Sequence, residues 1–539
     1  MVDYLTVKIR RMQHVTGEDR CQVEFGSLDD QIPEDDPVRF IDAFVEKVDL
    51  TRLGFRVAKV NAEGRPSFDT RLFLKIYFYG YHNGIRSSRK LERECYRNVE
   101  MQWLCNRLTP NYHTIADFRK VNAAALRNTF KLFVLFLRDA DLVEGKTIAV
   151  DGTKARAHNS KKNNYNPKKV KRHLSYIEEQ TNKYLAELDE ADAKENPDKI
   201  RNIKEKLGRL KENRLRYEDL GRQLEEGTEP QISTTDPDAR ALLIHGQVVE
   251  VSYNTQAAVD EKHKLVVATH TINRNDRNAL SAITLEAADN IGKKKFTALA
   301  DKGYNNAREI DRLQQAGFDT IVAQQDLVNS NEKGTTPDYL VNKFKYNKRS
   351  DTYTCPAGKK LHTTGTWHTK TRDGGVSYQF KKYRTPACGT CPVKHLCTSR
   401  KEGREIERSE FAEAMERNQR NYRERYDLYR KRQEINEHIF GTIKRVWGYY
   451  YTNLKGLKKV NGEWSLIMTV YNMKRCLNIL HFDELMNKLT NWKPKYRKEW
   501  RKAAFLESIW CFFRIRIKQA DMSVLKVRPL QNGFNPAWS

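Results

Sequence analysis

Two short apolar stretches, each followed by an aspartate, constrain the fold of this chain most strongly. One lies in FTALADKGYNNAREIDRLQQAGFDTIVA (296–323), where an apolar run precedes Asp301, a helical pattern follows and a second apolar run returns. A strand, a helix and a strand in this order form a βαβ unit with parallel strands. The other stretch, TIAV (147–150), precedes Asp151. We expect both acids at the carboxyl ends of neighbouring strands, where they can share one site.

The residues around Asp151 allow two interpretations. In one, Asp151 and Gly152 are simply the turn that ends a strand. In the other, the acid holds a metal ion, and the cations that follow it, among them Lys154 and Arg156, face a polyanion. Two nearby carboxylates repel one another unless a cation lies between them, and Mg²⁺ prefers such hard oxygen ligands. A second strand that ends on an acid therefore favours the metal site.

The composition favours a nucleic-acid partner. Of 539 residues, 97 are Lys or Arg and 70 are Asp or Glu, which gives a net charge of +27. An excess this large is typical of proteins that bind DNA or RNA. An anionic membrane surface is the alternative, but the chain shows neither a run of about 18 apolar residues nor a signal peptide, so we expect no membrane partner. The nine cysteines are too few for a disulfide scaffold, and a reducing cytoplasm is expected.

The rest of the chain falls into segments of distinct character, which together predict an α+β fold. Residues 165–228 are rich in Glu, Lys, Leu and Arg at helical spacing and are interrupted by KENPDK, as in a helical hairpin. Residues 245–272 predict two strands, and a helix follows them. The expected segments are a helical N-terminal domain (1–140), a catalytic core in three parts (141–161, 236–330 and 405–482), a helical-hairpin insertion (162–235), a Cys-rich β insertion (331–404) and a basic and apolar C-terminal tail (483–539). The N-terminal helices have the polar, basic starts of helix-turn-helix DNA-binding domains, although a plain helical bundle has the same pattern.

A third acid is expected on a long helix. We predict one helix over residues 422–450, and Glu437 lies on it. Lys444 follows seven residues later, nearly two turns, so both side chains should leave one face of the helix. An acid for a metal and a lysine for a phosphate on one face make a workable phosphodiester site. Helix spacing alone also allows a surface acid and base with no joint role.

The order of these elements is that of the RNase H-like fold with its three-acid metal site. The similarity is specific in four motifs: AVDGTKARAHNS, YNTQAAVDEKHKLVVATHTINRNDRNAL, ALADKGYNN and NEHIFGTIKRVWGY resemble those of bacterial insertion-sequence transposases of the DDE class. The chain is most similar to the group numbered eleven-eighty-two. RLFLKIYFYGYHNGIRSSRKLE and TIADFRK also resemble the N-terminal domain of that group, so the resemblance covers roughly residues 38–482.

The resemblance implies that Asp151, Asp301 and Glu437 are the three catalytic acids and that they bind Mg²⁺ or Mn²⁺. It also implies that Lys444 contacts DNA. We therefore expect a DDE transposase that cleaves DNA and transfers strands by two-metal phosphodiester chemistry.

The same resemblance implies an arginine four residues before Glu437 and a tyrosine three residues before that arginine. This chain has Gln433 and Arg430 at these two places. The neighbouring Tyr429, Arg430 and Arg432 would take over these roles after a small rotation of the helix.

The expected partner is DNA, both at the ends of the element and at its target. Lys154, Arg156, Lys444 and Arg445 are expected to hold phosphates near the metal ions. We expect a homo-oligomer that works on DNA in the bacterial cytoplasm, associated with the nucleoid. Two alternatives stay open: an RNase H-like nuclease that does not transfer strands, and a non-catalytic DNA-binding descendant of a transposase.

A cysteine cluster predicts a separate, structural metal site. Cys355 lies in DTYTCPAGKKL, and ACGTCPVKHLCTS holds Cys388, Cys391 and Cys397. A pair of cysteines two residues apart is the usual half of a Zn²⁺ site, because its thiolates can bind one tetrahedral ion. The segment between the two halves predicts a hairpin, so a zinc ribbon is reasonable. Reduced structural cysteines in a β insertion are the alternative.

Overall fold

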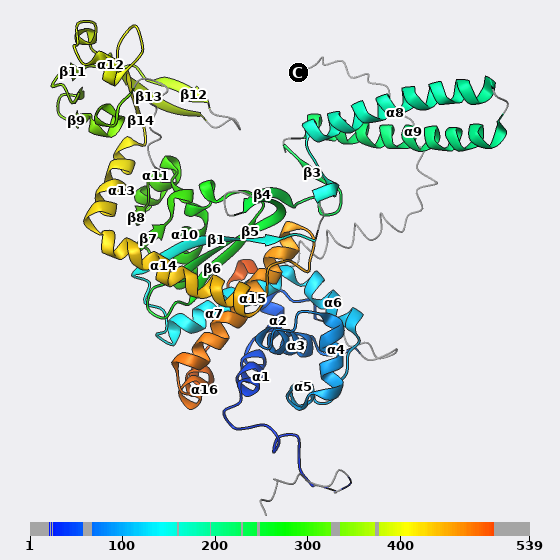
Figure 1. Ribbon diagram of the computed structural model, residues 1–539. Helices are drawn as coiled ribbons and strands as arrows, with labels where there is room; N and C mark the ends of the chain where they lie inside the picture. The colour runs from blue at the N-terminus through cyan, green and yellow to red at the C-terminus, as the bar shows by residue number, and fades with distance from the viewer. Residues whose placement is uncertain are drawn as a thin grey trace, which may run out of the picture.

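A mixed β-sheet at the centre of the molecule joins three outlying parts. The computed structural model describes residues 21–57 (without 22 and 24), 67–158, 161–193, 196–227, 230–244, 248–324, 335–371 and 377–500. In Figure 1 a helical N-terminal region lies below the sheet, and a helical hairpin and a small β-rich region lie above it on opposite sides. Most of the tail expected at 483–539 lies outside the described residues.

The central sheet has six strands, parallel on one side and antiparallel on the other. They are β1 (Thr147–Arg156), β4 (Arg240–Ile244), β5 (Val248–Asp260), β6 (Val266–Ile272), β7 (Thr297–Ala300) and β8 (Asp319–Val322). β1 pairs in parallel with β7, β7 pairs in parallel with β8, and β1 pairs antiparallel with β5. Along its other edge, β5 pairs antiparallel first with β4 and then with β6. The fold is therefore α+β, and both the βαβ unit and the two strands within 245–272 are present as predicted.

β1 is longer than the sequence indicated. It does not end at Asp151 but continues through Gly152 to Arg156, because β5 supplies backbone partners as far as Ser252. The expectation that Asp151 lies at the carboxyl end of its strand is therefore wrong, and so is the interpretation of Asp151 and Gly152 as a turn. β7 accompanies β1 only as far as Val150, so Asp151 lies where the parallel pairing stops.

Helices from distant parts of the chain pack on this sheet. α10 (Leu280–Ile291) and α15 (Leu457–Ile479) lie against β6, and α11 (Ala307–Gln315) connects β7 to β8. α13 (Ala412–Glu424) packs on β8, and α14 (Tyr426–Phe440) lies across β1. The last of these contacts brings a late segment of the chain to the strand that carries Asp151.

The single helix expected over residues 422–450 is not formed. α13 ends at Glu424, α14 begins at Tyr426, and a π-helical turn, η8 (Gly441–Val446), follows α14. The chain then leaves the helix at Gly448, whose φ of +71° lies in the left-handed region. A π-helical turn has more residues per turn than an α-helix, so it changes which side chains share a face.

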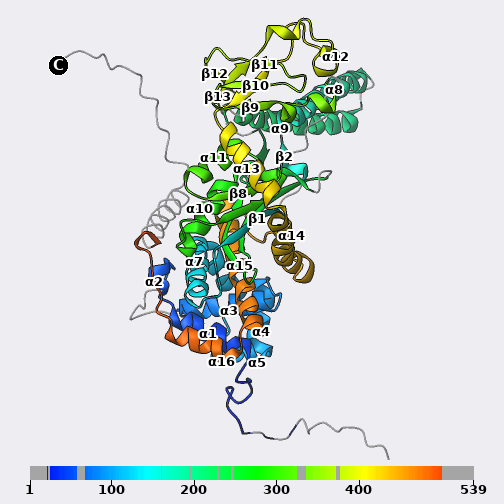
Figure 2. The same ribbon diagram turned by 90° about the vertical axis from the view of Figure 1, so that its left-hand side faces the viewer.

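The N-terminal helices and the sheet share one hydrophobic core. The helices are α1 (Pro37–Lys47), α2 (Leu50–Leu53), α3 (Thr70–His82), α4 (Ser88–Arg97), α5 (Val99–Leu104), α6 (Tyr112–Val121) and α7 (Ala123–Asp139). α7 packs along α15, and α16 (Phe482–Asn491) reaches α1, as Figures 1 and 2 show. After α16, Trp492 packs on Phe44 and Phe136, so the described start of the tail covers the N-terminal helices.

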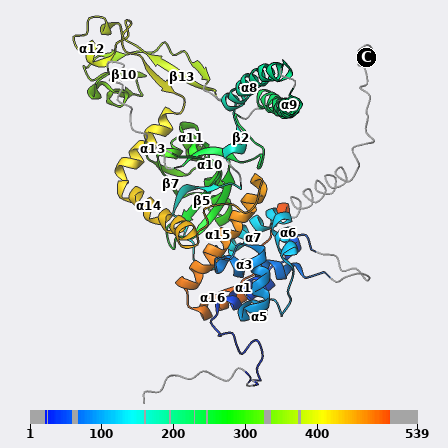
Figure 3. The same ribbon diagram turned by 45° about the vertical axis from the view of Figure 1, so that its right-hand side comes forward.

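Two insertions extend away from the sheet. α8 (Pro167–Ala193) and α9 (Pro197–Glu226) pair as a helical hairpin between β1 and β4, and this hairpin projects from the body in Figure 3. The β-rich region follows β8 and has its own small apolar core. Its strands are β9 (Lys345–Asn347), β10 (Thr352–Thr354), β11 (Lys360–Leu361), β12 (His368–Thr371), β13 (Ser377–Tyr383) and β14 (Ile406–Ser409).

Candidate active site

Asp151 and Asp301 lie next to each other where the two central parallel strands stop pairing. Val150 of β1 is in register with Ala300 of β7, so the residues that follow them are on adjacent strands, about 4.8 Å apart. Oδ1 of Asp151 accepts a hydrogen bond from the Gly152 amide at 2.8 Å, and Oδ1 of Asp301 accepts one from the Gly303 amide, also at 2.8 Å. The structure thus brings these two predicted acids together.

A third aspartate, which the sequence did not reveal, lies beside them. Asp276 begins the short helix η2 (Asp276–Asn278), four residues after β6 ends. Two amide side chains of β5, Asn254 and Gln256, donate hydrogen bonds to its carboxylate. The polar run NRNDRN after an apolar strand was the available signal, but a surface loop has the same composition.

Two glycines leave room for this acid cluster of Asp151, Asp276 and Asp301. A Cβ on Gly152 would lie 2.5 Å from Oδ1 of Asp276 and 2.9 Å from Oδ1 of Asn254, closer than such atoms approach. A Cβ on Gly303 would lie 3.0 Å from Oδ1 of Asp301 and 3.8 Å from Oδ2 of Asp276. Gly152 is therefore required by this close approach and not by a turn.

Asp151 lies near two other carboxylates and one arginine. Burial raises its pKa to about 6, and the nearby Asp301 and Asp276 carboxylates act in the same direction. The Arg432 guanidinium on α14, whose Nη1 lies 3.5 Å from Oδ2 of Asp151, opposes this rise. Tyr304, fully buried beneath the acids, donates a hydrogen bond to Gln256, and burial and the same three carboxylates raise its pKa well above the usual value. Carboxylate oxygens are the ligands that divalent cations such as Mg²⁺ prefer.

Glu437 lies on a different face of α14 from the arginine that reaches Asp151. Five residues advance an α-helix by about 500°, so Glu437 points about 140° away from Arg432. It is exposed and accepts a hydrogen bond from Gln433 at 2.7 Å. Within the described residues, no group of three or more His, Cys, Asp or Glu side chains is arranged to hold a metal ion. The three acids named from the sequence are thus not gathered into one ligand set, and the role of Glu437 stays a prediction.

The predicted DNA-binding cations lie along β1 and at the end of α14. Lys154 and Arg156 follow Asp151 on β1, and Nζ of Lys444 donates a hydrogen bond to the backbone oxygen of Lys154 at 2.7 Å. Burial and the neighbouring Lys154 lower the pKa of Lys444 to about 8. Arg445 and Arg156 are exposed. The π-helical turn between Glu437 and Lys444 changes the α-helical spacing that would place them on one face.

Two family models match the chain. A transposase domain (DUF772) matches residues 26–121, which hold α1 to α6, and a transposase DDE domain matches residues 354–477, which hold Glu437 and Lys444. The chain is an insertion-sequence DDE transposase. The two matches leave out the middle of the transposase, where Asp151, Asp276 and Asp301 lie.

No curated protein matches the transposase. Among solved structures, the piggyBac transposase synaptic complex with hairpin DNA is similar over 91% of this chain and 83% of that chain, with 9% identity and a TM-score of 0.31. A TM-score this low does not establish a common fold. In the described part of the transposase, no helix is long and apolar enough to cross a membrane.

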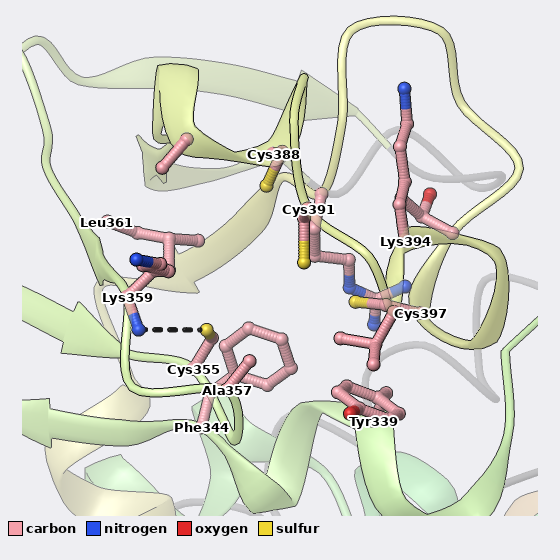
Figure 4. Close-up of a pocket in the computed structure, with 14 residues that line it drawn as sticks. Tyr339, Phe344, Cys355, Ala357, Lys359, Leu361, Cys388, Cys391, Lys394 and Cys397 are labelled. Carbon is pink, nitrogen blue, oxygen red and sulfur yellow. Dashed lines mark hydrogen bonds between the residues drawn. The ribbon is translucent and has the colours of Figure 1, made fainter.

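The four cysteines predicted to bind zinc line one pocket of the transposase (Figure 4). Cys355 follows β10, Cys388 ends η7 (Pro386–Cys388), and Cys397 ends α12 (Lys394–Cys397). Burial raises the pKa of the Cys397 thiol, nearby Arg404 opposes this, and the other three thiols raise it further. The sulfurs share the pocket, but among the described residues they do not form a ready metal-binding group either.

Proposed function

We propose that the transposase cleaves and joins DNA strands at a divalent-metal site that includes Asp151, Asp301 and Glu437. The adjacency of Asp151 and Asp301 on β1 and β7 is the observation that carries this proposal. The donor set fits Mg²⁺ or Mn²⁺, because both prefer carboxylate oxygens. When bound, such ions activate a water or a 3′-hydroxyl and stabilise the leaving oxygen of a phosphodiester.

We infer an RNase H-like catalytic core from the order of the strands. Across the sheet the order is β6, β5, β1, β7 and β8, with β1 central and both aspartates where β1 and β7 stop pairing. α14, which carries Glu437, lies across β1, and this contact supports Glu437 as the third acid. The motif resemblance supports membership in the group numbered eleven-eighty-two.

The cations beside the acids are proposed to hold the DNA. Lys154 and Arg156 follow Asp151 along β1, and Lys444 and Arg445 lie in η8, directly after α14. Contacts from these side chains to phosphates would position a strand over the acids without reading its sequence. A pKa of about 8 leaves most Lys444 side chains charged at neutral pH, and a nearby phosphate would favour that form. We also expect a homo-oligomer to assemble on the DNA.

The experiment uses the purified full chain, DNA that carries the ends of its element, and Mg²⁺. The wild type should give cleaved and joined products, and Asp301→Asn should reduce both by roughly a thousandfold or more. Asp338→Asn, an exposed aspartate in the β-rich region, is the matched control and should retain activity. Unchanged activity in Asp301→Asn would contradict the proposal. Cleavage without joining would favour a nuclease, and DNA binding without cleavage would favour a non-catalytic descendant.

We also propose that Cys355, Cys388, Cys391 and Cys397 bind one structural Zn²⁺. The support is that thiols from separate segments line one cavity of about 30 Å³, and thiolates are the ligands that structural zinc prefers. Metal analysis should find about one zinc per chain, and Cys388→Ser should lose it. Cys476→Ser, which alters a fully buried cysteine in α15, should retain the zinc. A zinc-free wild type would leave these four cysteines as packing residues.

A further inference from the structure

Asp276 is held in place by buried amides. Its Oδ1 accepts hydrogen bonds from Nδ2 of Asn254 at 2.7 Å and from Nε2 of Gln256 at 2.9 Å. Both amide side chains are fully buried, and the hydroxyl of Tyr304 fixes the orientation of Gln256 by donating to its Oε1. A carboxylate oriented this firmly is ready to bind a ligand with its remaining lone pairs.

The oxygen of Asn254 lacks a partner. Its Nδ2 donates both to Asp276 and to the backbone oxygen of Arg274 at 3.0 Å, so turning the amide over would place Oδ1 against two acceptors. In the observed orientation, Oδ1 is buried and finds no hydrogen-bond donor among the described residues. A buried acceptor without a partner is costly, and a cation is one of the groups that satisfies it.

The same oxygens pack against the two glycines. A Cβ on Gly152 would lie 2.5 Å from Oδ1 of Asp276, 2.5 Å from Nε2 of Gln256 and 2.9 Å from Oδ1 of Asn254. A Cβ on Gly303 would lie 3.0 Å from Oδ1 of Asp301 and 3.8 Å from Oδ2 of Asp276. Asp276 therefore lies between the unpaired Oδ1 of Asn254 and the predicted metal ligand Asp301.

We propose that Asp276 and Oδ1 of Asn254 are further ligands of the divalent cation, beside Asp151 and Asp301. This inference rests on the proposed function, because it names additional oxygens of the same site. Brought onto one ion, three carboxylates and one amide oxygen would make a hard, all-oxygen set of the kind that Mg²⁺ and Mn²⁺ bind. A purely structural Asp276 would need only its two amide donors and would not need to face Asp301.

The test measures Mn²⁺ binding to the DNA-free full chain by electron paramagnetic resonance, alongside cleavage in Mg²⁺. Asp276→Asn keeps an acceptor for both amides and removes the charge, so it should bind Mn²⁺ at least roughly tenfold more weakly and lose cleavage. Asn254→Ser removes the orphaned oxygen without changing any charge, and its Mn²⁺ affinity should fall several-fold, by roughly 3- to 10-fold. Asp338→Asn should bind as the wild type does.

The outcomes separate this inference from the proposed function. If Asp276→Asn and Asn254→Ser bind Mn²⁺ and cleave DNA as the wild type does, while Asp301→Asn does neither, the additional ligands are wrong and the function stands. If Asp301→Asn also binds and cleaves normally, the proposed site itself is wrong. If Asp276→Asn does not fold, Asn254→Ser decides alone, and an unchanged Mn²⁺ affinity in that variant overturns the inference.

Discussion

Glu463 is fully buried and Asp151 is partly buried, and the two carboxylates differ in the charge around them. Glu463 of α15 is fully buried, and its Oε1 lies 2.7 Å from Nη2 of Arg86 and 3.7 Å from Nη1 of Arg119. Burial alone would raise its pKa, but the two guanidinium groups hold it below the usual value. Asp151 has one arginine, Arg432, and two nearby carboxylates, and burial raises its pKa to about 6.

The difference separates a structural ion-pair cluster from a proposed binding site. Arg86 precedes α4 and Arg119 lies in α6, so their pairing with Glu463 joins the N-terminal helices to α15. Negative charge that the protein neutralises itself needs no ligand. Negative charge gathered beside more negative charge destabilises the fold by itself and is favourable only when a cation binds.

The largest expected effect is on catalysis. Asp151→Asn removes a proposed metal ligand and should reduce DNA cleavage in Mg²⁺ by about a thousandfold or more, because metal ions contribute several kcal/mol to such reactions. Binding of the same DNA should persist, since phosphate contacts come from other residues. Paired cleavage and gel-shift measurements test this, with Asp338→Asn as the control. A large loss of DNA binding in Asp151→Asn would show that the acid cluster acts in docking.

The next largest effect is on stability, at the buried cluster of Glu463, Arg86 and Arg119. Glu463→Gln leaves Arg86 and Arg119 without their carboxylate inside the protein and should lower the free energy of unfolding by roughly 3–5 kcal/mol. Urea unfolding followed by circular dichroism measures this. Glu434→Gln breaks an exposed pair with Lys264 and should have a far smaller effect. If Glu463→Gln and Glu434→Gln lost the same free energy of unfolding, Glu463 would contribute no more to stability than an exposed ion pair.

The two clusters should respond to pH in opposite directions. The pKa of Asp151 is 3.8 in the unfolded chain and about 6 in the folded protein. The raised pKa therefore costs no folding stability below about pH 4, where the carboxyl is protonated in both states, and it costs the most above about pH 6. Without divalent ions, Asp151→Asn should therefore be more stable than the wild type at pH 7 by up to about 2 kcal/mol, and equal to it near pH 4. The full shift is not expected to appear, because 28% of the side chain is exposed and screened.

Glu463 should show the reverse, because its folded pKa lies below its unfolded value. Its stabilisation is present above about pH 4.5 and is lost as the pH falls further. The deficit of Glu463→Gln should therefore shrink in acid. Unfolding curves between pH 3 and pH 8 compare both variants, and parallel pH profiles would contradict the assignment of opposite charge environments.

The smallest expected effect concerns the cations along β1 and α14. If Lys444 holds a phosphate, Lys444→Ala should lower the slope of log affinity against log salt by about one unit, equally for any sequence. Lys431→Ala serves as the control, because it removes an exposed lysine of α14 that pairs with Glu261 in the turn after β5. Fluorescence anisotropy at several salt concentrations measures the slope. An unchanged slope in Lys444→Ala would leave Lys444 as a support for the backbone of Lys154.

Local patterns predicted the elements of this fold better than they predicted its site. The apolar runs before Asp151 and Asp301 predicted strands, and β1 and β7 are indeed neighbours. Asp276 could not be predicted, because its place depends on β5 aligning Asn254 and Gln256 beneath it. That alignment is set by strand register, which no local pattern reveals.

The helix that carries Glu437 shows the same limit from another cause. Seven α-helical residues would place Lys444 on the face of Glu437, but the π-helical turn at Gly441–Val446 intervenes. Arg432 and Tyr429 are two of the neighbours expected to replace the missing arginine and tyrosine. Nη1 of Arg432 lies 3.5 Å from Oδ2 of Asp151, and its guanidinium carbon lies 5.8 Å from the centre of the Tyr429 ring. Side-chain periodicity cannot show where a helix changes its winding.

β1 is synthesised before β5 and β7, the two strands with which it pairs. Ile148 pairs with Asp260 on one side and with Ala298 on the other, so its last partner is 150 residues downstream. At about 5–20 residues per second, roughly 8–30 s pass between the synthesis of the two. During this interval Asp151 belongs to a strand without its neighbour, and Glu437 has not been made. The acid cluster therefore cannot assemble before Asp301 has been made, and the proposed third catalytic acid, Glu437, follows 136 residues later.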